Sequence, residues 1–142
     1  MSKLDIDGGA ERDTPKLSEG AHILELVSAV HDEGHEVGEY VSFIFKIKAS
    51  QDIETFPRGS SVRVQVNGLD SHDSYVRGKR LGQLRNILQA VAGLPQDAEV
   101  NDVLDQVLEG KFDGSAIRSL VEQFTTRKGN KQYTYHCTPH KA

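Results

Sequence analysis

Three patterns in the 142-residue chain predict a β-rich α+β domain. Alternating apolar residues recur in three stretches before residue 67, helical spacing replaces them between residues 78 and 108, and alternation returns from residue 115. The predicted order is therefore β-β-β-α-α-β-β. Five strands with a helical insertion between strands 3 and 4 are the element order of an oligonucleotide-binding (OB) fold, a five-stranded Greek-key barrel. The pattern by itself also fits other small α+β folds.

The first three strands are predicted from period-two alternation between turn residues. Residues 21–30 are rich in Ile, Leu and Val, and the polar loop 31–39 joins them in a hairpin to residues 40–48. Residues 49–60 form a turn with Pro57, and residues 61–66 alternate strictly. The residues of the second and third strands predicted to face the core are Val41, Phe43, Phe45, Ile47, Val62, Val64 and Val66.

Apolar residues at helical spacing predict two helices in the middle of the chain. The first lies within residues 78–93 and stops at Gly93, and the second runs near 98–108, with Asp97 as its N-cap and Gly110 as its stop. The predicted apolar stripes are Leu81, Leu84, Ile87, Leu88 and Val91 in the first helix, and Val100, Val103, Leu104, Val107 and Leu108 in the second.

The chain returns to strand character at its C-terminal end. Residues 115–126 and 131–137 flank a turn at 127–130, and Pro139 closes the last strand. At the other end, residues 1–16 have too few apolar side chains to offset the entropy of ordering. We therefore predict a disordered acidic arm at 1–16 and one domain at 17–142.

Composition excludes several classes of protein. Cys137 is the one cysteine, so no internal disulfide is expected and a reducing compartment, the cytoplasm, fits best. No run approaches the 18 apolar residues of a membrane span, and the first residues lack the apolar core of a secretory signal.

The net charge of −4 is unevenly distributed along the chain. Residues 1–39 hold ten acids and three bases, and residues 95–110 hold five acids and no base. In contrast, residues 75–94 hold four bases and no acid, and residues 111–142 hold six bases and two acids. Local basic surfaces are therefore expected on an acidic chain. The acidic arm is interpreted either as a competitor for such a surface or as a solubilising tail.

The chemistry of the chain does not favour catalysis. His31 and His35 are four residues apart, but they fall in a predicted hairpin loop rather than on a zinc-binding helix. Cys137 and His136 are strand neighbours that point to opposite faces, and Cys137 with His140 is only half of a zinc site. We expect no catalytic residue, metal site or cofactor.

Binding chemistry is concentrated in the last hairpin. Basic residues beside tyrosines on one strand face suit single-stranded nucleic acid, because cations neutralise phosphates and aromatic rings stack on unpaired bases. The alternative to nucleic-acid binding is that the basic turn is simply exposed to solvent and that the two tyrosines belong to the core. The candidate DNA-binding residues are Arg127, Lys128, Lys131, Tyr133 and Tyr135 in the hairpin, Lys46, Lys48 and Arg63 on the outward faces of the middle strands, and Arg77, Lys79 and Arg80 at the start of the first helix.

Several short segments together resemble phage-encoded OB-fold single-stranded DNA-binding proteins. They are the helix end from Ala90 to Leu94, the step from Leu108 to Lys111, the turn from Lys128 to Asn130 with Tyr133 and Tyr135 after it, and Pro139. The resemblance covers about residues 17–140. It implies an OB fold, cooperative coating of single-stranded DNA, and a role in DNA replication or recombination.

The partners implied by the resemblance are single-stranded DNA, further copies of the chain on that DNA, and replication or recombination proteins. Many such proteins end in an acidic tail, whereas this sequence carries its acidic segment at the N-terminal side. Aromatic residues are only 6% of the chain, so affinity is expected to depend more on charge than on stacking. The alternative function is an OB-like module for protein interaction or virion assembly, without nucleic acid.

Overall fold

We describe the protein from a computed structural model, in residue 17 and residues 19–35, 38–95, 97–125, 127–129 and 131–140. The predicted arm at 1–16 lies outside these residues. Leu17, where order was expected to begin, has only 2% of its surface exposed and belongs to the core.

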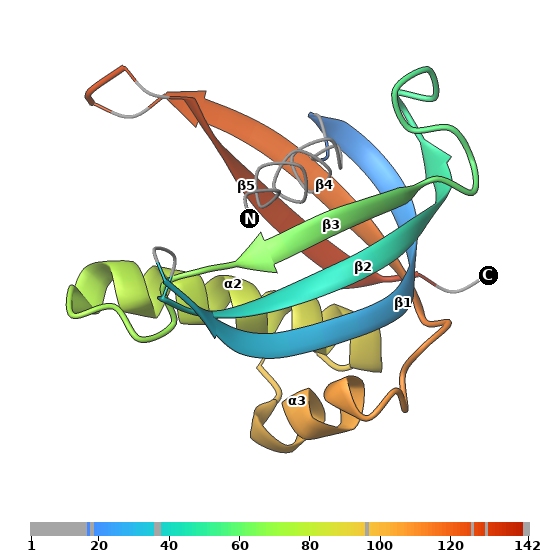
Figure 1. Ribbon diagram of the computed structural model, residues 1–142. Helices are drawn as coiled ribbons and strands as arrows, with labels where there is room; N and C mark the ends of the chain where they lie inside the picture. Colours follow the sequence, from blue (N-terminus) through green and yellow to red (C-terminus); the bar gives the residue numbers. More distant parts are fainter. Residues whose placement is uncertain are drawn as a thin grey trace, which may run out of the picture.

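The described chain forms one antiparallel sheet and two helices (Figure 1). The elements are β1 (Gly20–Gly34), β2 (Gly38–Ser50), β3 (Ser61–Val66), α2 (Ser74–Ala92), α3 (Asn101–Leu108), β4 (Ala116–Thr125) and β5 (Lys131–Pro139). Five strands with helices between the third and fourth confirm the predicted element order. The sheet order is β3-β2-β1-β4-β5, so β3 and β5 are its edges and the sheet does not close into a barrel over the described residues.

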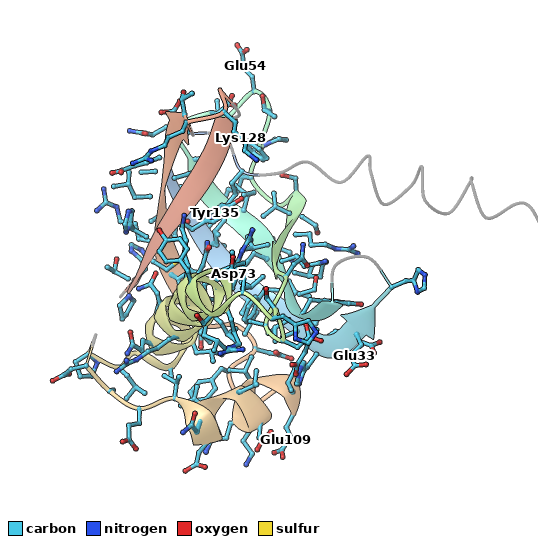
Figure 2. The ribbon with its side chains drawn as sticks, turned by 90° about the vertical axis from the view of Figure 1, so that its left-hand side faces the viewer. Glu33, Glu54, Asp73, Glu109, Lys128 and Tyr135 are labelled. Carbon is cyan, nitrogen blue, oxygen red and sulfur yellow. The ribbon has the colours of Figure 1, made fainter. Side chains whose placement is uncertain are left out.

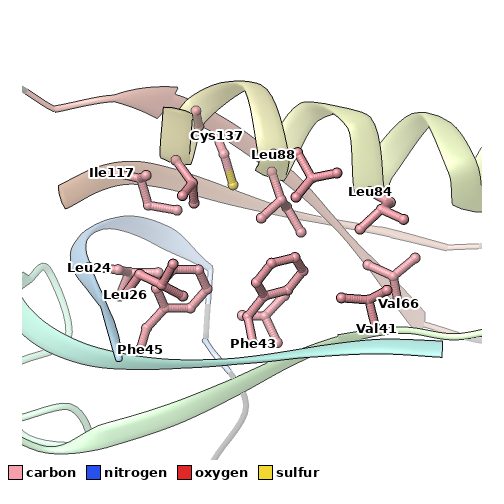
Figure 3. Packing of buried hydrophobic residues seen from close by; sticks show 14 of the residues in the cluster. Leu24, Leu26, Val41, Phe43, Phe45, Val66, Leu84, Leu88, Ile117 and Cys137 are labelled. Atoms are coloured by element: carbon pink, nitrogen blue, oxygen red, sulfur yellow. The ribbon is translucent and has the colours of Figure 1, made fainter. Parts of the chain in front are cut away.

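The core lies between the sheet and α2 (Figure 3). The predicted core faces of β2 and β3 are confirmed, because Phe43 and Phe45 are fully buried and the valines of β3 join them. Leu84 and Leu88 of α2 cover them from the other side. Phe56, in the loop after β2, is also buried, a contribution that a turn assignment did not predict.

Two irregularities bend the long β1–β2 hairpin. The register skips Lys48 on β2 and Val27 on β1, as a bulge on each strand does. After Val27 the inward residues of β1 change from even to odd numbers, so Leu26 and Ala29 both face the core. This explains why the pattern of residues 21–30 alternates imperfectly.

The predicted loop at 31–39 is wrong in extent. Pairing continues from His31 opposite Val41 to Gly34 opposite Gly38, which leaves only a short connection between the strands. This end of the hairpin is a ribbon with exposed side chains, so its polar residues pair without needing an apolar face. Because these residues are polar, the sequence pattern indicated a loop rather than a strand.

The first helix begins earlier than its apolar spacing predicts. Asp73 is its N-cap, and the Oδ1 atom of Asp73 accepts hydrogen bonds from the backbone N–H groups of Tyr75 and Val76. Gly93, with φ of 72°, ends the helix as predicted. Leu81 does not belong to the core stripe, because 44% of its surface is exposed.

The second helix matches its predicted apolar stripe only in part. Val103 and Val107 are buried, whereas Leu104 and Leu108 are half-buried. The predicted N-cap, Asp97, is wrong: Val100 occupies that position and no side chain caps the helix. Gly110, with φ of 86°, follows the helix end as expected.

One side chain of α2 completes the open edge of β5. The Nδ2 atom of Asn86 donates to the carbonyl oxygen of Cys137 at 3.0 Å, and the Cys137 N–H donates to the Oδ1 atom of Asn86 at 2.8 Å. The amide thus pairs with the backbone as a neighbouring strand would. It fixes α2 against β5 and satisfies a stretch of edge that would otherwise be free.

We expect Asn86→Ala to destabilise the fold by about 1–3 kcal/mol, because it leaves two backbone groups of Cys137 without partners. The free energy of unfolding, from urea titration, measures this. Gln83→Ala, at a half-buried position of the same helix, is the control and is expected to change stability by less than about 0.5 kcal/mol. Equal effects of the two substitutions would contradict the role assigned to Asn86.

Candidate nucleic-acid interface

The hairpin of β4 and β5 projects beyond the rest of the sheet. β1 pairs with β4 only as far as Gly20 opposite Val121, whereas β4 and β5 stay paired to Thr125 opposite Lys131. The outer part of the hairpin is therefore a two-stranded ribbon that reaches past β1 (Figure 1). Its turn carries Arg127 and Lys128, both exposed.

This hairpin tip, defined as Arg127 and Lys128, has little acidic charge around it in sequence. Glu122 is the one acid between residues 115 and 142. Its carboxylate lies 3.9 Å from the Nε2 atom of His136 across the two strands. Gly129 takes φ of 84°, the left-handed conformation that a tight turn requires. The tip thus presents two cations on a tight turn.

The ring of Tyr135 is not fully exposed, as a ring that only stacks on bases would be. It is half-buried and packs against the core, opposite Val121 of β4 (Figure 2). The side chains of Lys131 and Tyr133 lie outside the described part of the structure. That Tyr133 and Tyr135 share a face therefore stays a prediction, based on the alternation of side chains along a strand.

A second basic group, the outer-face cations, consists of Lys46, Lys48 and Arg63. Lys46 and Lys48 are exposed on β2, and Arg63 is half-buried on β3. Arg63 lies opposite Ile44, two residues from Lys46, so Lys46 and Arg63 are diagonal neighbours on one face. Lys48 reaches across to β1, where its Nζ atom lies 3.4 Å from the Oε1 atom of Glu25.

The third basic group lies on the first half of α2. Arg77 and Lys79 are exposed, and Arg80 is half-buried. The Nη1 atom of Arg77 donates to the carbonyl oxygen of Ser71 at 3.0 Å, which ties the helix start to the preceding loop. The stem of Arg80 lies near Gly68 in that same loop. These cations therefore flank the connection between β3 and α2.

Acidic surfaces border the basic ones. At the tip of the β1–β2 hairpin, the Nε2 atom of His31 lies 2.6 Å from the Oε2 atom of Glu39, and the Glu39 N–H donates to Asp70 at 2.9 Å. Around α3, the exposed acids are Asp97, Glu99, Asp102, Asp105, Glu109 and Asp113. Phosphates would be repelled from both regions, which limits where a polyanion can run.

In the part of the chain that the structure describes, the histidines and the cysteine that the sequence analysis considered lie apart or point to opposite faces. His31 belongs to a strand rather than a loop, and His35 lies in the exposed turn after it. Cys137 is buried while His136 is exposed, as expected for neighbours that point to opposite faces. Within the described residues, no group of three or more His, Cys, Asp or Glu side chains is placed to hold a metal ion.

The sequence analysis did not identify two exposed residues that lie near the basic groups. Arg118 lies on the outward face of β4, opposite Ile23 of β1, and only the register reveals that it belongs to the same sheet surface. Tyr75 lies in the first turn of α2 with 76% of its surface exposed. Asp73, a residue type that often caps helices, was the sequence feature that could have placed Tyr75 in the first turn.

The comparisons with known proteins leave the function open. No protein-family model matches the chain, and no curated protein matches it. Among the described residues, no helix has both the length and the apolar character needed to cross a membrane.

Burial raises the pKa of the Cys137 thiol to about 11, although a contact with Ser119 partly opposes this shift. The thiolate is the reactive form, so we expect the native protein to react very slowly with a disulfide reagent at pH 8, at a rate that rises with urea. Rapid reaction without urea would contradict the described burial.

Because the pKa of Cys137 is higher in the folded than in the unfolded protein, this thiol should lower the stability of the fold as the pH rises from about 9 to 11.

Proposed function

We propose that this protein binds single-stranded DNA without catalysing a reaction on it and with little dependence on base sequence. The observation that carries the proposal is the hairpin tip, where Arg127 and Lys128 are held out beyond the sheet. A projecting basic ribbon can follow a flexible backbone and neutralise its phosphates. The outer-face cations extend the positive surface onto β2 and β3.

The sheet order supports an OB fold as the finer description of this architecture. A five-stranded barrel opened between β3 and β5 would have the order β3-β2-β1-β4-β5, and OB folds are partly open barrels. In this structure α2 contacts β5, β4 and β3, so it lies across one end of the opening. In OB folds the face of strands 2 and 3, the loop between strands 1 and 2 and the loop between strands 4 and 5 bind oligonucleotides. Lys46 and Arg63 belong to that face, and the hairpin tip belongs to the loop between strands 4 and 5, whereas the hairpin of strands 1 and 2 is acidic here.

The proposed setting follows the phage family that the sequence resembles. The protein would coat DNA exposed during replication or recombination in the host cytoplasm, together with further copies of itself and with proteins of those processes. The buried, unpaired Cys137 suits a reducing compartment. The half-burial of Tyr135 favours binding through charge more than through stacking on this ring.

We expect the protein to bind a dT oligonucleotide more tightly than a duplex of equal length, with affinity that falls as salt rises. Each phosphate contact on a single strand contributes about −0.7 to the slope of log K against log salt, so three to five contacts give about −2 to −4. Fluorescence anisotropy at several salt concentrations measures the slope. No binding at low salt would exclude the proposed function and favour the protein-interaction module.

The double variant Arg127→Gln, Lys128→Gln is expected to weaken binding and to make the salt slope less steep by about 1.4, since two phosphate contacts are lost. Its melting temperature should stay near that of the wild type, because both side chains are exposed on a turn. The double variant Arg58→Gln, Lys111→Gln, which removes two exposed cations from outside the three basic groups, is the matched control and should leave affinity unchanged. Equal losses in the two proteins would show that only overall charge matters.

A further inference from the structure

Among the elements that the structure describes, none covers one face of α2 over its first turns. Tyr75, Gly78, Lys79 and Gly82 have the spacing i, i+3, i+4 and i+7, which places them on one side of a helix. All four are exposed, and we call them the α2 ridge. The buried residues of the helix, including Leu84 and Leu88, lie on the opposite side.

The helix that carries the ridge is basic, although the Asp73 carboxylate caps its start beside Tyr75. Helix α2 carries Arg77, Lys79, Arg80 and Arg85 and no acid. The Nη1 atom of Arg77 bonds to the carbonyl oxygen of Ser71, and the Nη2 atom of Arg85 bonds to that of Ala98 at 3.3 Å. Both acceptors are neutral, so these bonds do not cancel the positive charge. A polyanion is the ligand that such a face attracts.

Within the described part of the chain, no close contact requires a glycine at the two glycine positions of the ridge. A Cβ atom built on Gly78 or Gly82 would meet no atom within 4 Å, and neither residue has a positive φ. Glycine is also the least favourable helix residue after proline. What these glycines do provide is a bare strip of backbone between Tyr75 and the surrounding cations, where another molecule can approach the helix closely.

Part of the ridge lies on the side of α2 that carries Asn86, the residue bonded to β5. Lys79, Gly82 and Asn86 follow one another at i, i+3 and i+7, and Asn86 bonds to Cys137 of β5. Lys79 and Gly82 are therefore on the β5 side of the helix. In Figure 2, where α2 is seen nearly end-on, β5 rises from the helix toward Lys128 at the hairpin tip.

We propose that the α2 ridge is a second contact for single-stranded DNA, with Tyr75 stacking on a base and Lys79 neutralising a phosphate. This inference rests on the proposed function and extends it: the strand leaves the hairpin tip, follows β5 and reaches α2. A ring exposed to 76% at the end of a cationic face is the arrangement that stacking requires. A second copy of α2 would bring like charges together, which argues against self-association here.

The test compares Tyr75→Ser with Ile53→Ser, a matched loss of an exposed apolar side chain from the β2–β3 loop. The probe is a dT oligonucleotide of about 30 nucleotides, roughly twice the largest site of one OB fold. We expect Tyr75→Ser to weaken binding about fivefold or more, and Ile53→Ser to bind within twofold of the wild type. Both melting temperatures should remain near the wild-type value.

A second variant separates binding from folding. Gly78→Ala with Gly82→Ala should raise the melting temperature, because alanine favours helix, and should weaken DNA binding by filling the bare strip. Wild-type affinity in both the Tyr75 and the glycine variants would overturn the inference while leaving the proposed function standing. No binding by the wild-type protein would overturn both. Loss of binding to vesicles with anionic lipid, without loss of DNA binding, would identify a membrane surface instead and overturn the inference.

Discussion

The pairing of the Asn86 amide with both backbone groups of Cys137 fixes the arrangement on which the rest of the structure depends. It joins α2 to an edge strand of an open sheet, and so orients the helix that covers the core. With the helix held there, Leu84 and Leu88 face Phe43 and Phe45, and the opposite side of the helix is left exposed beside β5. One side-chain amide thus connects the packing of the core to the geometry of the candidate binding surface.

Charge is segregated in space as well as in sequence. The cations of the hairpin tip, of α2 and of the outer sheet face belong to other parts of the fold than the acidic regions at the tip of the β1–β2 hairpin and around α3. A polyanion would be attracted to the first set and repelled from the second, although the whole chain has a net charge of −4. The acidic regions would then restrict the path of a strand rather than prevent binding.

Much of the fold could be predicted because its alternation is local. In β2 and β3 the burial pattern follows the sequence directly, since Phe43, Phe45 and the three valines need only a pleated strand with one buried face. The ends of elements were less predictable. The bulge at Val27 changes the phase of β1, and the polar ribbon at 31–34 pairs without an apolar face. Leu81 fits a helical stripe but lies where α2 extends past the core, which no local pattern reveals.

The candidate site was predictable in its residue types but not in its placement. The turn around Gly129 was visible in the sequence, whereas its projection past β1 depends on where the β1–β4 pairing stops. Tyr75 was missed because its significance comes from its exposure in the first turn of a helix that carries four cations. Hydrogen–deuterium exchange of the protein with and without a dT oligonucleotide tests the central claim most directly. The account predicts added protection in the β4–β5 hairpin and the first turns of α2, and protection confined to α3 or the β1–β2 hairpin would contradict it.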